Sequence, residues 1–379
     1  MLALIIVAIA VVVLAAAYCA AMLLLARAVV FPQRARPAKI FHVSPSGDVE
    51  LTSNPLTRFG GIIGLLYDDE TKLAVLTSAV DEEDADGTVV RHLAEPAALE
   101  AGTDGRAAGN VFTPTNVTTT PPASVEIHTD HASQPAWLYA GTGAASSTWV
   151  IHVHGMLAGR DSALRSVQAV AGAGYTSLVI SYRGDREAAG ETREPSALGQ
   201  AEWQDLDAAI AYARSQGAAR IVVVGWSLGA TVALEETTRG LQGASIDALV
   251  LVSPVVSWAR TIHYGMARQH VPRWLASSAI ALLSSRLGAR VLGLPLTLSL
   301  TEALPTVSIP TLVIHSTGDL TTPFAASEAF AASSDRVVLE QFPASPHAME
   351  WNAAPKLFAA HVDDWIVANL RQSDAEDVK

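Results

Sequence analysis

Residues 220–234 constrain the fold of this chain more than any other stretch. An apolar, β-branched run, Ile221–Val224, is followed by Gly225-Trp-Ser-Leu-Gly229 and then by an Ala-rich, helix-forming segment. This order predicts a buried strand that turns sharply into a helix, with Ser227 on the turn. Side chains at both glycine positions would collide with neighbouring backbone. Ser227 is therefore expected to stand exposed at the carboxyl edge of a parallel sheet.

The rest of the C-terminal two thirds repeats the alternation of strands and helices. Strands are expected near residues 125–128, 136–139, 148–154, 177–182, 221–224, 248–252, 311–315 and 337–342, with helices near 161–173, 202–216 and 325–332. Continuous apolar strands alternating with helices are typical of a parallel sheet covered on both faces. We therefore predict an α/β domain over residues 124–372, with a mostly parallel central sheet and helices on both sides.

The amino terminus is a candidate membrane span. Residues Leu2–Ala26 carry no charge, and a helix of this length can cross a hydrocarbon core of roughly 30 Å. We predict a single transmembrane helix at residues 1–30. A cleaved signal peptide is the alternative, although the segment lacks a basic start and its apolar run is long for one.

Basic residues follow this span and only the amino terminus precedes it. They are Arg27, Arg34, Arg36 and Lys39. Because positive charge is retained on the cytoplasmic side, the α/β domain is expected to face the cytoplasm.

Between the span and the α/β domain, two further segments are expected. Short apolar or alternating runs broken by turn residues predict a small β-rich module at residues 38–95. Residues 96–123, rich in Ala, Gly, Thr and Pro, are predicted to form a linker or an extended crossing segment. The acidic run Asp81–Asp86 is interpreted as a solvated turn rather than a metal site.

Charge and cysteine content exclude several classes of function. The net charge of −12 and the absence of clustered cations argue against a nucleic-acid partner. The single cysteine, Cys19, allows no disulfide and no cysteine-based metal site within the chain.

Ser227 would need a base, since a serine hydroxyl is a poor nucleophile at neutral pH. In the order expected after a serine on such a turn, an acid and then a histidine follow on loops after later strands. Asp319 follows the strand near 311–315, and His347 follows the last strand. We predict Ser227 as nucleophile, His347 as general base then acid, and Asp319 as the carboxylate that orients the imidazole. As alternatives, Asp319 could only shape a turn and His347 could lie on the surface.

An oxyanion formed by attack on a carbonyl requires donors already in place. The backbone N–H groups of Leu228 and Met156 are predicted to supply them, with Gly155 allowing close approach of the loop. His152 and His154 alternate along a strand as metal ligands can, but no adjacent carboxylate accompanies them. No metal is predicted, and both histidines are expected to pack around the oxyanion loop.

These motifs resemble the α/β-hydrolase superfamily in its serine-hydrolase form. The resemblance rests on residues 154–156, 181–185, 198–203 and 225–229, and extends to membrane-anchored bacterial members distantly similar to the prolyl-oligopeptidase and monoacylglycerol-lipase groups. It implies a two-step acyl-enzyme reaction without a cofactor. By the same analogy, residues 255–309 form a short helical cap over Ser227, whose apolar faces either line an acyl pocket or only pack against the domain.

The predicted function is hydrolysis of small carboxylic esters, with an apolar acyl group, by a serine hydrolase. Peptidase, thioesterase and acyltransferase activities stay open because they share the acyl-enzyme intermediate. A non-catalytic binding protein that retains the fold is the alternative from another class. Tyr182, Arg183, Asp185 and Glu202 are expected to form a polar network near the cap, although Arg183 could instead meet a substrate carboxylate.

Overall fold

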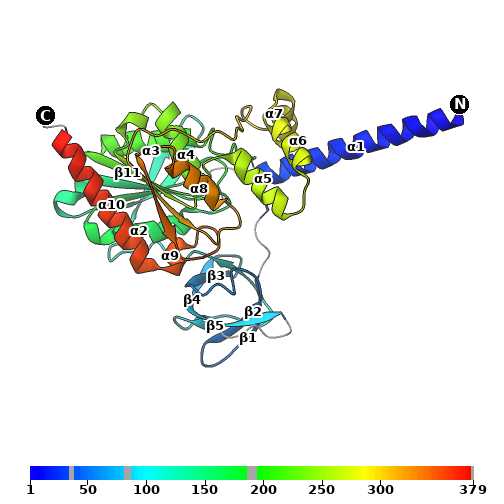
Figure 1. The fold of residues 1–379 in the computed structure, drawn as a ribbon. Helices are drawn as coiled ribbons and strands as arrows, with labels where there is room; N and C mark the ends of the chain where they lie inside the picture. Colours follow the sequence, from blue (N-terminus) through cyan, green and yellow to red (C-terminus); the bar gives the residue numbers. More distant parts are fainter. Residues whose placement is uncertain (34–37, 81–86, 186–193, 377–379) are drawn as a thin grey trace.

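A computed structural model describes residues 1–33, 38–80, 87–185 and 194–376 (Figure 1). A long N-terminal helix, α1 (Leu2–Val30), precedes a small β-barrel and a larger α/β domain. The acidic run at 81–86, and two of the basic residues used to predict orientation, Arg34 and Arg36, lie outside the described residues.

The α/β domain is built on an eight-stranded sheet with the order β14-β13-β12-β11-β9-β10-β8-β7. Its strands are β7 (Ala123–His128), β8 (Ser133–Tyr139), β9 (Thr148–Val153), β10 (Thr176–Ile180), β11 (Arg220–Trp226), β12 (Ala248–Val252), β13 (Thr311–Ser316) and β14 (Val337–Phe342). In this order, all neighbouring strands from β14 to β10 pair in parallel. At the other edge, β8 pairs antiparallel with both β10 and β7. The predicted fold class, a mostly parallel sheet, is confirmed.

Alternate side chains of each central strand enter two different cores. In β11, Ile221 and Val223 pack against one set of helices, while Val222 and Val224 pack against the other. The first set is α3 (Trp203–Ser215), α4 (Leu228–Arg239) and α8 (Phe324–Ala331); the second is α2 (Leu164–Val170), α9 (Glu350–Ala353) and α10 (Pro355–Glu376). Because both faces of the sheet are covered, the strands are continuous apolar runs rather than alternating ones.

The segment expected to form a cap contains three helices. They are α5 (Trp258–Arg268), α6 (Arg273–Leu283) and α7 (Arg286–Leu292). These helices lie beside the α/β domain and against α1 (Figure 1). They share one apolar cluster with Met156 of the domain and with Ala26 and Val30 of α1.

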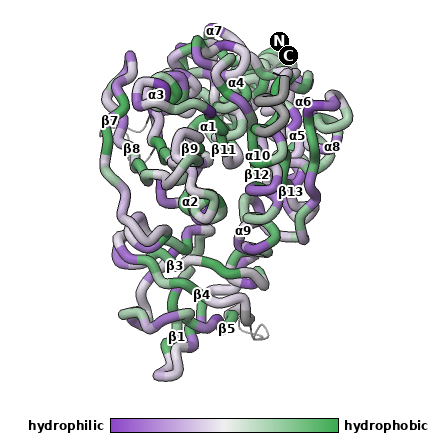
Figure 2. Tube along the Cα trace, turned by 90° about the vertical axis from the view of Figure 1, so that its left-hand side faces the viewer, coloured by the Kyte–Doolittle hydropathy of each residue, from purple (hydrophilic) through white to green (hydrophobic). Residues whose placement is uncertain are grey.

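The N-terminal β-rich region is a closed six-stranded barrel with the order β1-β2-β5-β4-β3-β6. Its strands are β1 (Ala38–Val43), β2 (Asp48–Thr52), β3 (Ile63–Tyr67), β4 (Lys72–Val80), β5 (Thr88–Leu93) and β6 (Asp104–Ala108). The barrel lies below the α/β domain, with β3 beside α9 (Figure 2).

Strand β6 corrects the prediction of a linker over residues 96–123. It pairs with both β1 and β3, so the barrel extends past residue 95. The pattern Gly105-Arg-Ala-Ala108 lacks the β-branched and aromatic residues that mark strands. A residue without a side chain fits best at position 105, because an added Cβ would lie 2.7 Å from the Leu65 side chain on the paired strand, which would have to move. Tertiary closure of the barrel, not local propensity, makes this segment a strand.

Helix α1 is long and apolar enough to cross a membrane. Length and composition alone also suit a signal sequence.

Candidate active site

Ser227 occupies the sharp turn between β11 and α4. Its backbone has φ 53° and ψ −110°, a conformation that a residue with a side chain rarely adopts. The flanking glycines are required by contact with backbone. A Cβ at Gly225 would lie 2.5 Å from the Gly229 carbonyl oxygen, and one at Gly229 would lie 2.3 Å from that of Val153. The fold therefore holds the Ser227 side chain at the carboxyl edge of the sheet.

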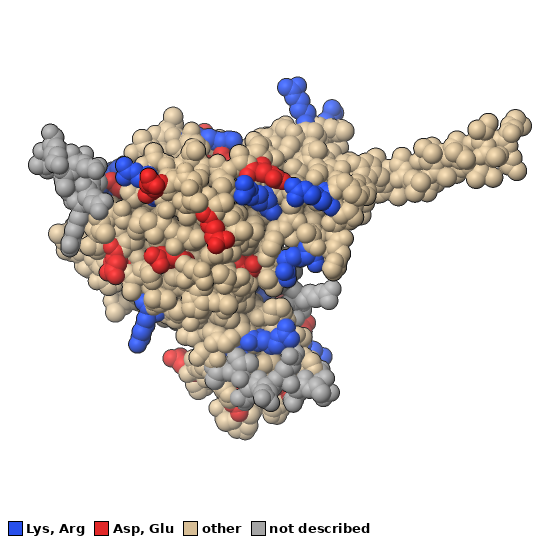
Figure 3. Space-filling model, in the orientation of Figure 1, with Lys and Arg blue, Asp and Glu red and all other residues tan. Residues whose placement is uncertain are grey.

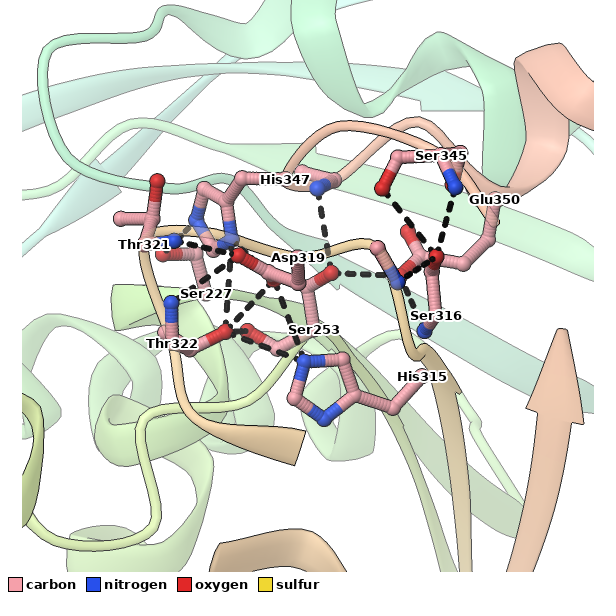
Figure 4. A network of polar contacts seen from close by, with 12 residues as sticks. Ser227, Ser253, His315, Ser316, Asp319, Thr321, Thr322, Ser345, His347 and Glu350 are labelled. Atoms are coloured by element: carbon pink, nitrogen blue, oxygen red, sulfur yellow. Dashed lines mark hydrogen bonds and ion pairs between the residues drawn. The ribbon is translucent and has the colours of Figure 1, made fainter. Parts of the chain in front are cut away.

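The loops after β13 and β14 bring Asp319 and His347 to this serine (Figure 4). Nε2 of His347 lies 2.8 Å from Oγ of Ser227, and Nδ1 lies 2.6 Å from Oδ2 of Asp319. Because an ionised carboxylate only accepts hydrogen bonds, Nδ1 carries the proton. Nε2 is then free to accept the proton of the Ser227 hydroxyl.

Asp319 is buried and accepts hydrogen bonds on both oxygens. Backbone N–H groups of Thr321 and Thr322 donate to Oδ1 at 2.7 and 3.0 Å, and the Thr322 hydroxyl donates to Oδ2 at 2.7 Å. Nε2 of His315 donates to Oδ2 at 3.1 Å. Burial alone would raise the pKa of Asp319, but the charge of His347 and these donors hold it far below its usual range. Asp319 is therefore an anion at every pH at which the protein would work.

His347 is partly exposed, with 22 % of its side chain accessible to solvent. Burial lowers the pKa of its imidazole, but the adjacent Asp319 carboxylate outweighs this and leaves the pKa above the usual value. An imidazole with a raised pKa is a stronger proton acceptor, which is what activation of a serine hydroxyl requires.

The two residues predicted as oxyanion donors also lie beside Ser227. Leu228 is the first residue of α4, directly after the serine. A Cβ added to Gly155 would lie 3.3 Å from the Ser227 Cβ, so the loop that continues into Met156 passes close to the nucleophile. Met156 and Leu228 both line a small pocket next to the serine.

The carbonyl groups of this loop are held by a polar cluster behind it. Nδ1 of His154 donates to the Gly155 carbonyl at 2.9 Å, and its Nε2 lies 3.0 Å from Oδ2 of Asp185. The Tyr182 ring stacks on His154, and its hydroxyl donates to the Gly155 carbonyl at 3.0 Å. These contacts fix the backbone of the loop at Gly155, directly before Met156.

The other histidine of this strand has a different environment. His152 is fully buried, and its Nδ1 lies 2.8 Å from the Ser166 hydroxyl of α2. Burial lowers its pKa to about 3, which keeps the imidazole neutral. Within the described ranges, no group of three or more His, Cys, Asp or Glu side chains could hold a metal ion.

The polar residues expected to form one network near the cap are divided among separate clusters. Arg183 forms a bidentate ion pair with Asp205, with contacts of 2.8 and 2.9 Å. Glu202 accepts from the backbone N–H groups of Ala197 and Gly199 at 2.9 Å. Arg183 already has its carboxylate partner, so the structure does not favour its recognition of a substrate carboxylate.

The His347 loop is supported by residues that the sequence did not single out. The Ser253 hydroxyl donates to Glu350 at 2.5 Å and accepts from the Ala348 N–H at 3.0 Å. Arg165 donates to the Ala348 carbonyl at 2.6 Å. Ser253 and Arg165 come from distant parts of the chain, and only the position of Ser253 at the carboxyl end of a predicted strand could have suggested a role for it.

A family model described as the alpha/beta hydrolase family matches residues 138–361, more than half of the chain. The chain belongs to the α/β-hydrolase family. A search of curated protein sequences found no match.

Solved structures with the same fold include the Pyrococcus furiosus esterase Pf2001. One crystal form of that esterase has a TM-score of 0.51 and 20% sequence identity, covering 68% of this chain and 96% of the esterase. A second form has a TM-score of 0.52 and 19% identity, covering 68% and 95%. Est1E from Butyrivibrio proteoclasticus has a TM-score of 0.47 and 15% identity, covering 65% and 99%. The uncovered third of this α/β hydrolase corresponds in size to α1 and the barrel.

Proposed function

We propose that this α/β hydrolase is a serine hydrolase that cleaves carboxylic esters through an acyl-enzyme intermediate. The observation that supports it best is the continuous chain of contacts from Ser227 through His347 to Asp319, at 2.8 and 2.6 Å. Strained backbone at Ser227 and the depressed pKa of Asp319 are both features that recur at catalytic sites.

In the first half-reaction, Oγ of Ser227 attacks the ester carbonyl carbon while its proton passes to Nε2 of His347. The carbonyl oxygen becomes an oxyanion that accepts from the N–H groups of Leu228 and Met156. The bond from carbon to the alcohol oxygen then breaks, and His347 gives its proton to the departing alcohol. Asp319 stays ionised and balances the imidazolium.

In the second half-reaction, water replaces the alcohol. His347 takes a proton from the water as its oxygen attacks the acyl carbon. The bond to Oγ of Ser227 breaks, the serine recovers its proton from His347, and the carboxylic acid leaves. No cofactor takes part in either step.

The surroundings of the serine favour an apolar acyl group. The adjacent pocket is lined by the apolar side chains of Met156, Leu157, Leu228 and Val30 and by polar ones, among them Arg183, Asp185 and Glu202. These three charged groups already have partners within the protein. Met156 and Trp258 of α5 also pack against the apolar clusters on both sides of the site. A small ester whose acyl part is apolar would bury surface here, whereas a peptide would present polar backbone groups to these side chains.

A fluorophosphonate probe tests the proposal, since it forms a covalent bond only with an activated serine. Full-length wild type in detergent should be labelled, and Ser227→Ala should not. Ser278→Ala, which removes a serine from the cap, is the matched control and should be labelled like wild type. Absence of labelling on folded wild type, or labelling retained by Ser227→Ala, would support the non-catalytic binding protein instead.

Hydrolysis of acyl esters of graded chain length would then assign the substrate class. Rates that rise with chain length support an apolar acyl site. Faster turnover of thioesters or of peptide amides, or transfer to an alcohol in place of water, would assign the thioesterase, peptidase or acyltransferase alternative.

We also propose that α1 is a retained transmembrane helix with the α/β domain on the cytoplasmic side. Two contacts favour retention over cleavage: the Ser196 N–H donates to the Val30 carbonyl at 2.9 Å, and the Tyr18 hydroxyl donates to Ser278 at 2.8 Å. Leu241→Cys, at an exposed site on the α/β domain, tests the orientation. An impermeant maleimide should label it only after the cells are opened; labelling in intact cells would reverse the proposed orientation.

A further inference from the structure

The cap and the membrane helix pack against each other. The C-terminal part of α1 is covered by cap residues, with Ala26 and Val30 buried. Further out, the Tyr18 ring stacks on Trp274 of α6 with ring centres 5.9 Å apart. The cap is therefore the part of the molecule from which α1 emerges (Figure 1).

The exposed part of α1 shows where the surface of the bilayer would lie. Every residue from Leu2 to Ala20 is exposed, and coverage by the protein begins at Ala21. This exposed stretch is about 28 Å long as a helix, close to the thickness of roughly 30 Å of a hydrocarbon core. Tyr18 and Trp274 then lie at the boundary between lipid and water, where aromatic side chains are enriched in membrane proteins. The cap lies directly against that boundary.

The cap differs in charge from the rest of the protein. The chain as a whole has a net charge of −12, but residues 254–301 contain no Asp or Glu. Its basic residues are Arg260, Arg268, Arg273, Arg286 and Arg290. Blue side chains are visible at the α7 end of the cap, near the root of α1, in the space-filling view (Figure 3).

Acidic residues outside the cap neutralise only part of this charge. Glu302 accepts from Arg273 at 2.8 Å. In the parts of the chain that the structure describes, Arg286 and Arg290 of α7 have no acidic partner. Two cations on one short helix are thus available to an external anion.

The same helices expose large apolar side chains. Trp274, Leu287 and Val291 are 62%, 66% and 55% exposed. In α7, Leu287, Arg290 and Val291 are spaced three and four residues apart and share one face. Exposed apolar residues mixed with arginines are typical of helices that lie in a membrane interface.

We infer that this cap surface, formed by Arg273, Trp274, Arg286, Leu287, Arg290 and Val291, binds the anionic surface of the bilayer that α1 enters. Leu287 and Val291 enter the headgroup region, and Arg286 and Arg290 contact lipid phosphates. The inference rests on the proposed membrane anchor, but not on catalysis. It places the pocket beside Met156 about 15 Å from the hydrocarbon core, because Val30, which lines that pocket, follows Ala20 by ten residues of α1.

Site-specific fluorescence in the full-length chain tests this contact. Cys19→Ser removes the only cysteine, and Leu287→Cys then takes a bimane label. The protein is reconstituted into vesicles of equal parts phosphatidylcholine and phosphatidylglycerol that contain lipid with brominated acyl chains, which quench only nearby labels. Leu241→Cys, 89% exposed on the α/β domain, is the matched control, and Ala10→Cys reports on α1.

Quenching at 287 and 10, but not at 241, is the expected result. Arg286→Glu combined with Arg290→Glu should then reduce the quenching at 287 without changing that at 10. Quenching at position 10 alone would overturn the inference about the cap but leave the membrane anchor standing. The same holds if the label at 287 is quenched by neither brominated lipid nor aqueous iodide, because a second copy or another protein then covers it. Quenching at neither site would overturn both.

Discussion

Arg165 donates a hydrogen bond to the side-chain oxygen of Asn352 at 2.5 Å, and both side chains are buried. Arg165 also holds the carbonyl of Ala348, the residue after His347. The amide nitrogen of Asn352 donates in the other direction, to the barrel carbonyls of Ile62 and Gly109 at 2.7 and 3.0 Å. One buried network therefore joins the barrel to the loop that carries the proposed general base.

Asn352→Ala should destabilise the protein and lower its activity. It removes two bonds to the barrel and leaves the Arg165 guanidinium and two carbonyls without these partners, which costs about 2 kcal/mol or more. We expect Tm to fall by roughly 5 °C and kcat to fall with it, because the His347 loop loses its support. Asn369→Ala removes an amide that bonds only one carbonyl within α10 and is the control for thermal unfolding. Equal Tm values for the two variants would contradict a linking role for Asn352.

This network could not be predicted from the sequence, although much of the fold could. Continuous apolar strands such as Ile221–Val224 indicate a buried parallel sheet, because a strand covered on both faces needs apolar side chains on both. The turn at Ser227 is equally local, since its two glycines and its strand and helix are adjacent in the chain. Arg165 and Asn352 are far apart in sequence, and nothing local indicates that they meet.

The last strand of the barrel and the partners of Asp319 could not be predicted, for the same reason. Strand β6 consists largely of small residues, which barrel closure selects and which local propensity assigns to a linker. For His315, its place in an apolar strand predicts only a packed core residue. Its burial agrees with that interpretation, but its ring also donates to Asp319. The separation of Arg183 from Tyr182 likewise depends on pairing with Asp205, which is on another element.

The pH dependence of kcat/KM should report His347. The imidazole must be neutral to accept a proton, so the rate falls as pH drops through its pKa. Burial lowers this pKa, but the Asp319 charge raises it more. The midpoint of the acid limb should therefore lie above the ordinary histidine value of about 6.5.

Asp319→Asn should lower kcat by roughly 10⁴ and move this midpoint to lower pH, because burial then acts on His347 without the opposing carboxylate. The measurement is kcat/KM for a water-soluble ester across the neutral and acid range. An unchanged midpoint in the variant would show that Asp319 does not set the pKa of His347.

The glycines of the turn allow a matched pair of substitutions. In Gly229→Ala the new Cβ would lie 2.3 Å from the Val153 carbonyl oxygen, so the turn or the neighbouring strand must move. We expect loss of fluorophosphonate labelling and a lower free energy of unfolding. In Gly265→Ala, in the middle of α5, the new Cβ meets no atom within 4 Å apart from the adjacent backbone of its own helix. Because alanine favours a helix, that variant should label normally and gain up to about 1 kcal/mol. Normal labelling of Gly229→Ala would contradict the need for close backbone approach at the turn.

His315 should act as a positioning residue for Asp319. His315→Leu removes one donor to the carboxylate, a bond to a charged group that contributes about 1.5–3 kcal/mol. A depressed carboxyl pKa stabilises the fold above the unfolded value of about 3.9, and this stability is lost as pH falls through the folded pKa. The variant should therefore have a higher Asp319 pKa. The ionised carboxylate then adds less to the free energy of unfolding at neutral pH, and acid unfolding begins at a higher pH.

The same substitution should lower kcat by roughly tenfold with little change in KM, because a less firmly held carboxylate orients His347 less well. His315→Gln can still donate to Asp319 and should recover much of both losses, which a purely space-filling role would not predict. His361→Leu removes a partly exposed histidine 3.6 Å from Glu340 and controls for loss of a surface charge pair. If leucine and glutamine at position 315 give the same acid unfolding midpoint and the same kcat, the donor is irrelevant and His315 only fills the core beneath the site.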